Sequence, residues 1–266
     1  MTGTLVHYRV EKGVAIFELN DPPANTYTYE MNKELDGLIL AARMDDDVHV
    51  IVLRGAGEKF FSAGANITML AEVTPQFKYN FCLHANETLM RLEQTPKLVI
   101  AALNGHTVGG GLEIAMAADI RIALKGAGKM GLPEVGLGVL PGTGGTARLS
   151  RLIGKSKSIQ IMVEGQLFDF ERGLELGIIN YVWPAEENEQ KWWDRVMEYA
   201  WSFCPPAKAS KAVGRIKRAV QTGWEIPIES ALALERELQQ QLFQSEDARE
   251  GLDAYSGKRK AKFTGK

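Results

Sequence analysis

Residues 104–119 read Asn104-Gly-His-Thr-Val-Gly-Gly-Gly-Leu-Glu113-Ile-Ala-Met-Ala-Ala-Asp119. Two short apolar runs flank this segment, LVIAAL at Leu98–Leu103 and IRIAL at Ile120–Leu124. Apolar runs of this length are typical of buried strands. The small residues of 109–118 predict a helix between them. Because strands alternate with helices, the sequence favours an α/β fold over an all-β or all-α one.

The same alternation extends toward the N-terminus. An alternating run from Leu5 to Val10, a turn at Lys12-Gly13 and a return run at Val14–Leu19 predict a β-hairpin. Apolar residues at helical spacing predict an amphipathic helix over residues 29–43. The β-branched run 48–53 predicts a further buried strand.

Past about residue 205 the patterns are helical only. Residues 207–220 form a basic segment, and Ile228–Phe243 carries leucines at helical spacing. Ser245, followed by two acids, is typical of a helix start. We therefore expect a core of residues 1–204 and a helical region of residues 205–266. The basic tail KRKAKFTGK is expected to be frayed.

The composition is that of a globular protein. The 266 residues are 45% hydrophobic and 24% charged, with a net charge of −2, which excludes a disordered chain and any overall attraction to nucleic acid or membrane. The N-terminus has no signal-peptide pattern, and no apolar run approaches ~18 residues. Cys82 and Cys204 form no Cys-x-x-Cys pair, and the histidines lack ligand spacing. We expect a cytoplasmic protein without a metal.

Glycines cluster in three places, around Gly64, Gly105–Gly111 and Gly142–Gly145. Such clusters let backbone N–H groups approach a ligand closely. A phosphate-binding Walker loop is excluded because no lysine follows the second glycine of Gly105 to Gly110. A dinucleotide fingerprint matches by letter at Gly126 and at Gly142, but neither copy lies between a strand and a helix as that motif requires.

Three linked segments resemble the crotonase (enoyl-CoA hydratase/isomerase) superfamily in composition, order and spacing. They are Phe60-Phe-Ser-Ala-Gly-Ala-Asn66-Ile, the segment 104–119, and Gly131-Leu-Pro-Glu134-Val-Gly-Leu-Gly-Val-Leu-Pro141-Gly-Thr-Gly-Gly-Thr146. The resemblance covers essentially the whole chain. It implies a spiral of β-β-α units with two roughly perpendicular sheets. It also implies a C-terminal helical region that packs on neighbouring subunits of a trimer or dimer of trimers, with Leu234, Leu238 and Leu242 facing a partner.

The resemblance also implies roles for individual residues. The backbone N–H groups of Ala65 and Gly110 form an oxyanion hole for the thioester oxygen, which gains negative charge as an enolate forms. Glu134 exchanges the proton at the α-carbon, Glu113 binds and polarises the water, and the N–H of Gly142 helps to hold that water. Hydratases of the family carry glutamates at both positions, whereas many isomerases keep only one. The two glutamates therefore favour hydration of a 2-enoyl-CoA over isomerisation or another acyl-CoA reaction of the family.

Coenzyme A is then part of the substrate, and no separate cofactor is expected. The residues expected to bind it are Ala63, Ala65, Asn66 and Ile67 near the adenine, and Tyr255 and Lys258 at the nucleotide end of a neighbouring subunit. Two positions depart from the family pattern, because Asn66 stands where aspartate is common and Thr68 where lysine is frequent.

Several residues keep open interpretations. Tyr27 and Tyr29 replace a more usual Ala-Leu-Asn-Ala-Leu type of segment and either line the entrance or pack under a helix, with packing favoured. The resemblance implies that the helix of His84 can approach the acyl pocket, although a surface or core histidine is favoured. His106 is expected to be a polar loop residue. The basic helix with Lys208, Lys211, Arg215, Lys217 and Arg218 is expected to be a solvated face, with RNA binding as a remote alternative. The shape of the acyl chain stays open.

Overall fold

Two β-sheets form the centre of the molecule in the computed structural model, which describes residues 4–186 and 188–266. The first has the strand order β1-β2-β3-β5-β7-β10 and the second the order β4-β6-β8-β9. The strands of the first sheet are β1 (Val6–Glu11), β2 (Val14–Leu19), β3 (Val50–Gly55), β5 (Leu98–Leu103), β7 (Ile120–Leu124) and β10 (Tyr181–Trp183). Those of the second are β4 (Phe60–Ser62), β6 (His106–Val108), β8 (Lys129–Gly131) and β9 (Phe168–Asp169).

From β3 to β8, consecutive strands alternate between the two sheets. β3, β5 and β7 lie side by side in the first sheet, and each is followed in the chain by β4, β6 or β8 of the second. A helix follows each pair, so the chain winds as a spiral of β-β-α units, as expected. The hairpin β1–β2 is antiparallel, whereas β2, β3, β5 and β7 pair in parallel. The strand expected at 48–53 begins two residues later.

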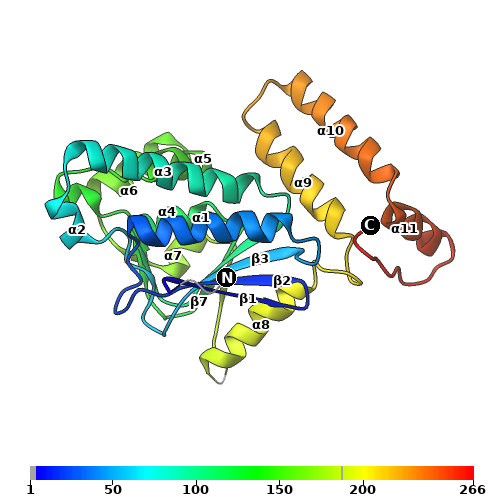
Figure 1. The fold of residues 1–266 in the computed structure, drawn as a ribbon, viewed down its shortest axis with the longest axis horizontal. Coiled ribbons are helices and arrows are strands. Elements are labelled where there is room, and N and C mark those ends of the chain that lie inside the picture. Colours follow the sequence, from blue (N-terminus) through cyan, green and yellow to red (C-terminus); the bar gives the residue numbers. More distant parts are fainter. Residues whose placement is uncertain (1–3, 187) are drawn as a thin grey trace.

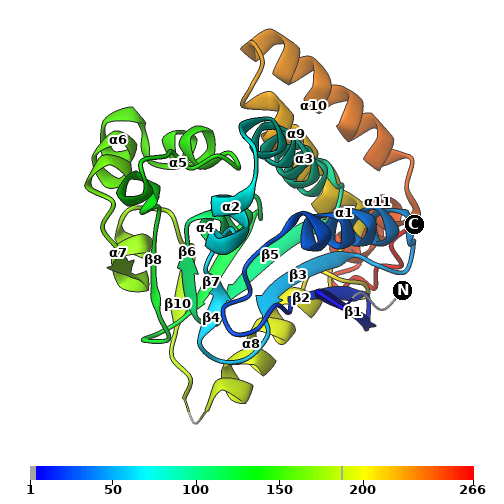
Figure 2. The same ribbon diagram turned by 60° about the vertical axis from the view of Figure 1, so that its left-hand side comes forward.

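Helices cover both faces of the first sheet (Figures 1 and 2). The helices are α1 (Tyr29–Met44), α2 (Ile67–Glu72), α3 (Pro75–Gln94), α4 (Gly110–Met116), the 3-10 helix η1 (Glu134–Leu137), α5 (Gly145–Ile153), α6 (Lys155–Glu164), α7 (Phe170–Glu175), α8 (Glu189–Trp201), α9 (Ser210–Gly223), α10 (Ile228–Phe243) and α11 (Glu246–Ser256). No helix in the described ranges combines the length and the apolar character that crossing a membrane would take.

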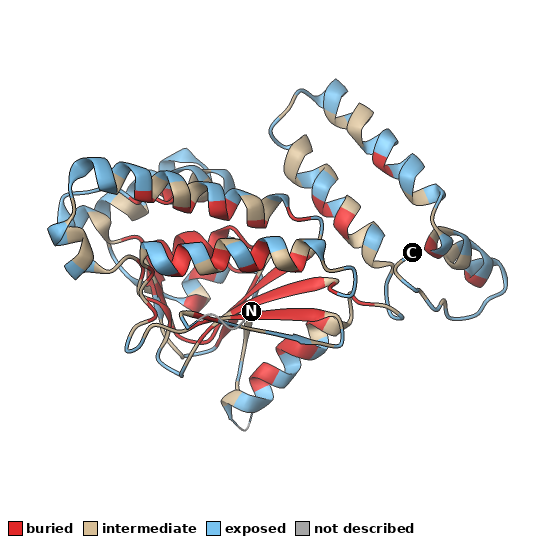
Figure 3. Ribbon diagram, in the orientation of Figure 1, coloured by how far each residue is buried: buried red, intermediate tan, exposed pale blue. Residues whose placement is uncertain are grey.

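Alternate residues of the first sheet enter two hydrophobic cores. Phe17 of β2 packs in the core shared with α1, α3 and α4, while its neighbour Ile16 packs in the core beneath α8, where Trp192 is fully buried. The red strands between the helical layers in Figure 3 mark this burial. A parallel sheet covered on both faces needs continuous apolar strands, which explains the short apolar runs in the sequence.

The C-terminal helices α9, α10 and α11 extend away from the sheets (Figure 1). The division expected between residues 204 and 205 falls in the segment that joins α8 to α9. α10 packs against α9, and Leu238 is already buried within this single chain. The prediction that Leu238 faces a partner is therefore wrong, because the helical hairpin covers it. Leu234 and Leu242 are half-buried.

The C-terminal tail is held in place, so the prediction that it is frayed is wrong. The carboxylate of Asp247, buried in α11, accepts hydrogen bonds from the N–H groups of Thr264 and Gly265 at 2.7 and 2.9 Å. Glu250 pairs with Arg259 and accepts from the N–H of Lys262. Asp247 and Glu250 of α11 therefore bind backbone N–H groups of the tail. The prediction considered only the basic residues of the tail and could not identify these partners.

One member of the basic helix is buried. Lys217 of α9 forms an ion pair with Asp119 at 2.8 Å and also donates to the carbonyl groups of Leu92 and Lys97. The prediction of a fully solvated basic face is therefore wrong at this position. Lys217 joins α9 to the residues directly before β5 and β7, Lys97 and Asp119, and it is not available to bind RNA.

Candidate active site

Glu113 lies at the buried N-terminal turn of α4. Its side chain is 1% exposed, and its Oε1 accepts hydrogen bonds from the N–H groups of Thr143 and Gly145 at 2.8 and 2.6 Å. Burial raises the pKa of Glu113 above its usual range, while the two N–H donors act in the opposite direction. The segment 143–145, which leads into α5, thus holds one oxygen of this carboxylate.

Glu134 begins η1, directly after Pro133 and strand β8. Its Oε1 lies 2.9 Å from the position that a Cβ on Gly109 would occupy, so this carboxylate lies beside the N-terminus of α4. Its Oε2 is buried and has no hydrogen-bond partner within residues 4–186 and 188–266. Burial raises the pKa of Glu134 to about 7, and the charge of Glu113 adds to the increase. The group can therefore carry or release a proton near neutral pH.

This pKa gives a prediction about stability. The pKa of Glu134 is about 7 in the folded protein and 4.5 in the unfolded chain. The folded protein therefore loses stability as the pH rises from 4.5 to about 7, because the folded state disfavours the ionised carboxylate. Glu134→Gln should therefore raise Tm relative to the wild type by more at about pH 8 than at about pH 4.5. The control Glu237→Gln, at an exposed position in the middle of α10, should show no such difference. Equal Tm changes for Glu134→Gln at both pH values would contradict the raised pKa.

The proposed oxyanion donors lie on two loops that approach each other closely. A Cβ on Gly64, whose φ is +87°, would lie 2.7 Å from the backbone nitrogen of Gly110, so only glycine fits there. Gly110 opens α4, where the first N–H groups have no partner within the helix. The hydrogen bonds between this loop and Tyr27 use the N–H groups of Tyr27 and Asn66, not that of Ala65. Within residues 4–186 and 188–266, neither the N–H of Ala65 nor that of Gly110 donates a hydrogen bond, so both can bind an oxygen, and Gly110 does so at the positive end of the α4 dipole.

Tyr27 was expected to pack, and it does, but it also reaches the site. The ring is 2% exposed, stacks on Phe81 with centroids 5.4 Å apart, and lies against Gly110. Its hydroxyl lies 2.5 Å from Oγ1 of Thr143. Sequence reasoning named Tyr27 without giving it a role in the reaction, and it did not identify Thr143. The available indication was the departure of residues 23–29 from the family pattern.

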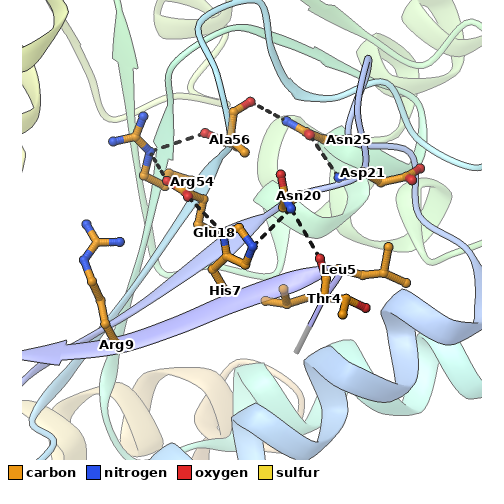
Figure 4. Close-up of polar contacts among 12 residues, drawn as sticks. Thr4, Leu5, His7, Arg9, Glu18, Asn20, Asp21, Asn25, Arg54 and Ala56 are labelled. Carbon is orange, nitrogen blue, oxygen red and sulfur yellow. Dashed lines mark hydrogen bonds and ion pairs between the residues drawn. The ribbon is translucent and has the colours of Figure 1, made fainter. Parts of the chain in front are cut away.

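The segment before Tyr27 is fixed by Asn25. The side-chain amide of Asn25 donates to the carbonyl oxygens of Ala56 and Phe60 at 2.9 Å each, and its Oδ1 accepts from the N–H of Asp21 at 3.2 Å. Figure 4 shows Asn25 between Asp21 and Ala56, beside the polar contacts of the hairpin. Asn25 is buried and has a positive φ of 49°. Its three hydrogen bonds hold the backbone in this conformation and so direct the chain toward the site.

The other candidates have different positions. His106 is the first residue of strand β6, so the prediction of a loop position is wrong. Its Nδ1 accepts a hydrogen bond at 3.1 Å from the N–H of Lys129, the first residue of the neighbouring strand β8. His84 packs edge-on against Tyr29, and its Nδ1 is buried without a partner in the described chain. The carbonyl of Gly142 accepts from Asn86 at 3.4 Å, and this glycine directly precedes Thr143.

The residues expected to bind coenzyme A fall into two groups. Ala63, Ala65 and Asn66 lie between β4 and α2, and Ile67 is the first residue of α2. Ala65 is itself one of the two proposed oxyanion donors. The side chain of Asn66 caps α2 by accepting from the N–H of Met69 at 3.0 Å, which an aspartate could also do. Tyr255, 87% exposed, lies on α11, far from α2 in Figure 1, and Lys258 follows that helix. The single chain does not bring these two residues to the site.

The sequence matches the profile of the enoyl-CoA hydratase/isomerase family over residues 9–266. The chain belongs to this family. A short-chain-enoyl-CoA hydratase of Clostridium acetobutylicum is 39% identical over 251 residues, which are 94% of each chain. A crotonyl-CoA hydratase of Syntrophomonas wolfei is 32% identical and covers 96% of each chain. A crystal structure of an enoyl-CoA hydratase from Geobacillus kaustophilus superposes with a TM-score of 0.95 at 42% identity, covering 100% of this chain and 98% of that one.

Proposed function

We propose that this member of the family catalyses the reversible addition of water to a 2-enoyl-CoA thioester, giving a 3-hydroxyacyl-CoA. The observation that carries the proposal is the position of two buried or half-buried carboxylates, Glu113 and Glu134, at the N-terminus of α4 beside two close backbone donors. The family match and the hydratase names of the relatives support it.

The proposed reaction starts with the thioester oxygen between the N–H groups of Ala65 and Gly110. The ionised Glu113 accepts a proton from water as the water oxygen bonds to the β-carbon, and the electrons of the double bond move onto the thioester oxygen as an enolate. The protonated Glu134 then gives its proton to the α-carbon. A pKa of about 7 suits Glu134 to that task, and the two backbone donors stabilise the enolate. The N–H of Gly142 is proposed to orient the water.

The closest alternative is isomerisation of an enoyl-CoA, which needs only one acid/base. A panel of 2-enoyl-CoA substrates of increasing chain length, followed by the loss of enoyl absorbance, tests the proposal. The names of the two relatives support a short acyl chain. A thiol reagent run in parallel detects a thioesterase, which would release free coenzyme A. Activity on 3-enoyl-CoA alone, or thiol release, would overturn the proposal.

The proposal includes a trimer or dimer of trimers and a cytoplasmic location. Support for assembly comes from a cavity of about 1180 Å³ between α3, α5 and α9. Three large side chains along it, Ile216, Val220 and Trp224, are 63%, 66% and 74% exposed in the single chain. Apolar surface of this extent is typical of a face that another subunit covers.

In such an assembly Lys258 would reach the nucleotide end of coenzyme A on a neighbouring subunit. Lys258→Glu should then raise KM more than it lowers kcat, because a contact remote from the reaction acts equally on substrate and transition state. Lys191→Glu, an equal charge reversal at an exposed position of α8, is the matched control. An unchanged KM in the Lys258→Glu enzyme would show that the C-terminal region does not contact the substrate.

A further inference from the structure

One hydrogen bond joins the loop of Tyr27 to the loop that holds Glu113. The hydroxyl of Tyr27 lies 2.5 Å from Oγ1 of Thr143, and both side chains are 2% exposed. Thr143 is also one of the two residues whose N–H groups donate to Oε1 of Glu113. Tyr27 and Thr143 are 116 residues apart in the chain, and they meet at the residue that donates to the carboxylate of Glu113.

The loop of Thr143 is held on its opposite side as well. Arg148 donates to the carbonyl oxygen of Thr143 at 2.9 Å, and the same guanidinium forms two hydrogen bonds with Glu93, at 2.8 and 2.7 Å. Bidentate pairs of this kind fix the direction of an arginine side chain. The Thr143 backbone is therefore anchored through Arg148 to α3, and the Thr143 side chain is anchored through Tyr27.

Tyr27 itself has little freedom. Its N–H donates to the carbonyl of Gly64 at 3.0 Å, and its carbonyl accepts from the N–H of Asn66 at 3.3 Å. The ring is held between Phe81 and Gly110: a Cβ added at Gly110 would lie 2.0 Å from the tyrosine Cε1. The loop that carries the oxyanion donor Ala65 therefore also holds the backbone of Tyr27. With the backbone and the ring held, the hydroxyl stays directed at Thr143.

The hydroxyl of Tyr27 carries its proton at neutral pH. Burial, together with the nearby charge of Glu113, raises the pKa of Tyr27 above its already alkaline usual value. A neutral phenol can donate to Thr143 without adding charge beside two carboxylates. Phe81, by contrast, stacks on the ring and offers no such donor.

We propose that Tyr27 is a positioning residue for the hydration reaction: through Thr143 it holds the backbone donors that orient the carboxylate of Glu113 toward the water. The inference rests on the proposed role of Glu113. It assigns to Tyr27 an effect on the turnover step, beyond its packing, and it links the oxyanion loop to the water-binding carboxylate. Thr143 is the intermediary, and Tyr27 need not touch the substrate.

The test begins with Tyr27→Phe, which keeps the ring and removes the hydroxyl. A lost hydrogen bond of ordinary strength should lower kcat by about fivefold to tenfold. KM should change little, because the oxyanion donors remain. The acid limb of the pH profile of kcat should move to higher pH, since the N–H donors that lower the pKa of Glu113 are held less firmly. Tyr29→Phe, at a ring 36% exposed two residues away, should leave kcat unchanged.

A double-mutant cycle isolates the contact. In a Thr143→Val background, Tyr27→Phe should cost less than about twofold in kcat, because its partner is already gone. Thr143→Ser keeps a hydroxyl and should retain more of kcat than Thr143→Val, which tests the idea even if the Tyr27 variant fails to fold. Additive effects, an unmoved acid limb, or equal kcat in the Ser and Val enzymes would overturn the inference. A wild type without hydratase activity, or an active Glu113→Gln enzyme, would instead overturn the proposed function.

Discussion

Glu113→Gln and Glu134→Gln should each lower kcat for hydration by about 10²–10⁴-fold, the range expected when a positioned acid or base is lost. The double variant should cost little more than the worse single one, because the two groups act as a unit. Glutamine at 113 keeps an oxygen that can accept from Thr143 and Gly145, so the loop should stay in place while the charge is lost. KM should change little, because the oxyanion donors are backbone groups.

The same pair of variants separates a hydratase from an isomerase. In an isomerase with one acid/base, Glu134→Gln would be nearly inactive, whereas Glu113→Gln would keep most activity on a 3-enoyl substrate. Glu229→Gln, at an exposed position in the first turn of α10, controls for the substitution itself and should keep full activity. Substantial hydratase activity in the Glu113→Gln enzyme would refute the two-carboxylate mechanism.

The second large effect is expected for Gly110→Ala. The added methyl would lie 2.0 Å from Cε1 of Tyr27, so either the ring or the start of α4 must move. Displacing an oxyanion donor costs about 10²–10³-fold in kcat, and overpacking costs about 1–3 kcal/mol of stability. Both losses should appear together, in a hydration assay and in a denaturant titration.

Gly37→Ala is the matched control for this substitution. Gly37 lies within α1, and a Cβ there would meet nothing within 4 Å, so the same change should leave kcat intact and stabilise the helix slightly. An active and stable Gly110→Ala enzyme would contradict the close contact between Tyr27 and the oxyanion loop.

The fold could be predicted from the sequence because the short apolar strands and the glycine segments each require a particular environment. Leu98–Leu103 is buried along its whole length between two helical layers, and a short, fully apolar run is typical of such a strand. Glu113 and Glu134 could be found because the segments that carry them resemble the crotonase superfamily in order and spacing. The structure brings both to the N-terminus of α4.

The remaining features depend on contacts between distant residues. Tyr27 meets Thr143, Lys217 meets Asp119 and the tail meets Asp247, each across a separation that no local pattern encodes. The sequence around Tyr27 does not distinguish a hydroxyl that faces water from one that contacts a buried threonine. Only the folded chain shows that the Tyr27 hydroxyl contacts the side chain of Thr143, whose N–H donates to Glu113.

The most direct test of the account is hydration in isotopically labelled water. The wild-type protein, given a short 2-enoyl-CoA in oxygen-18 water or in deuterium oxide, should form a 3-hydroxyacyl-CoA. Mass spectrometry should find one solvent oxygen on the β-carbon and one solvent hydrogen on the α-carbon, with the thioester intact and the Glu113→Gln enzyme inactive. Label in a released carboxylic acid, or a product that carries solvent hydrogen but no solvent oxygen, would contradict the assignment of Glu113 and Glu134 to water addition.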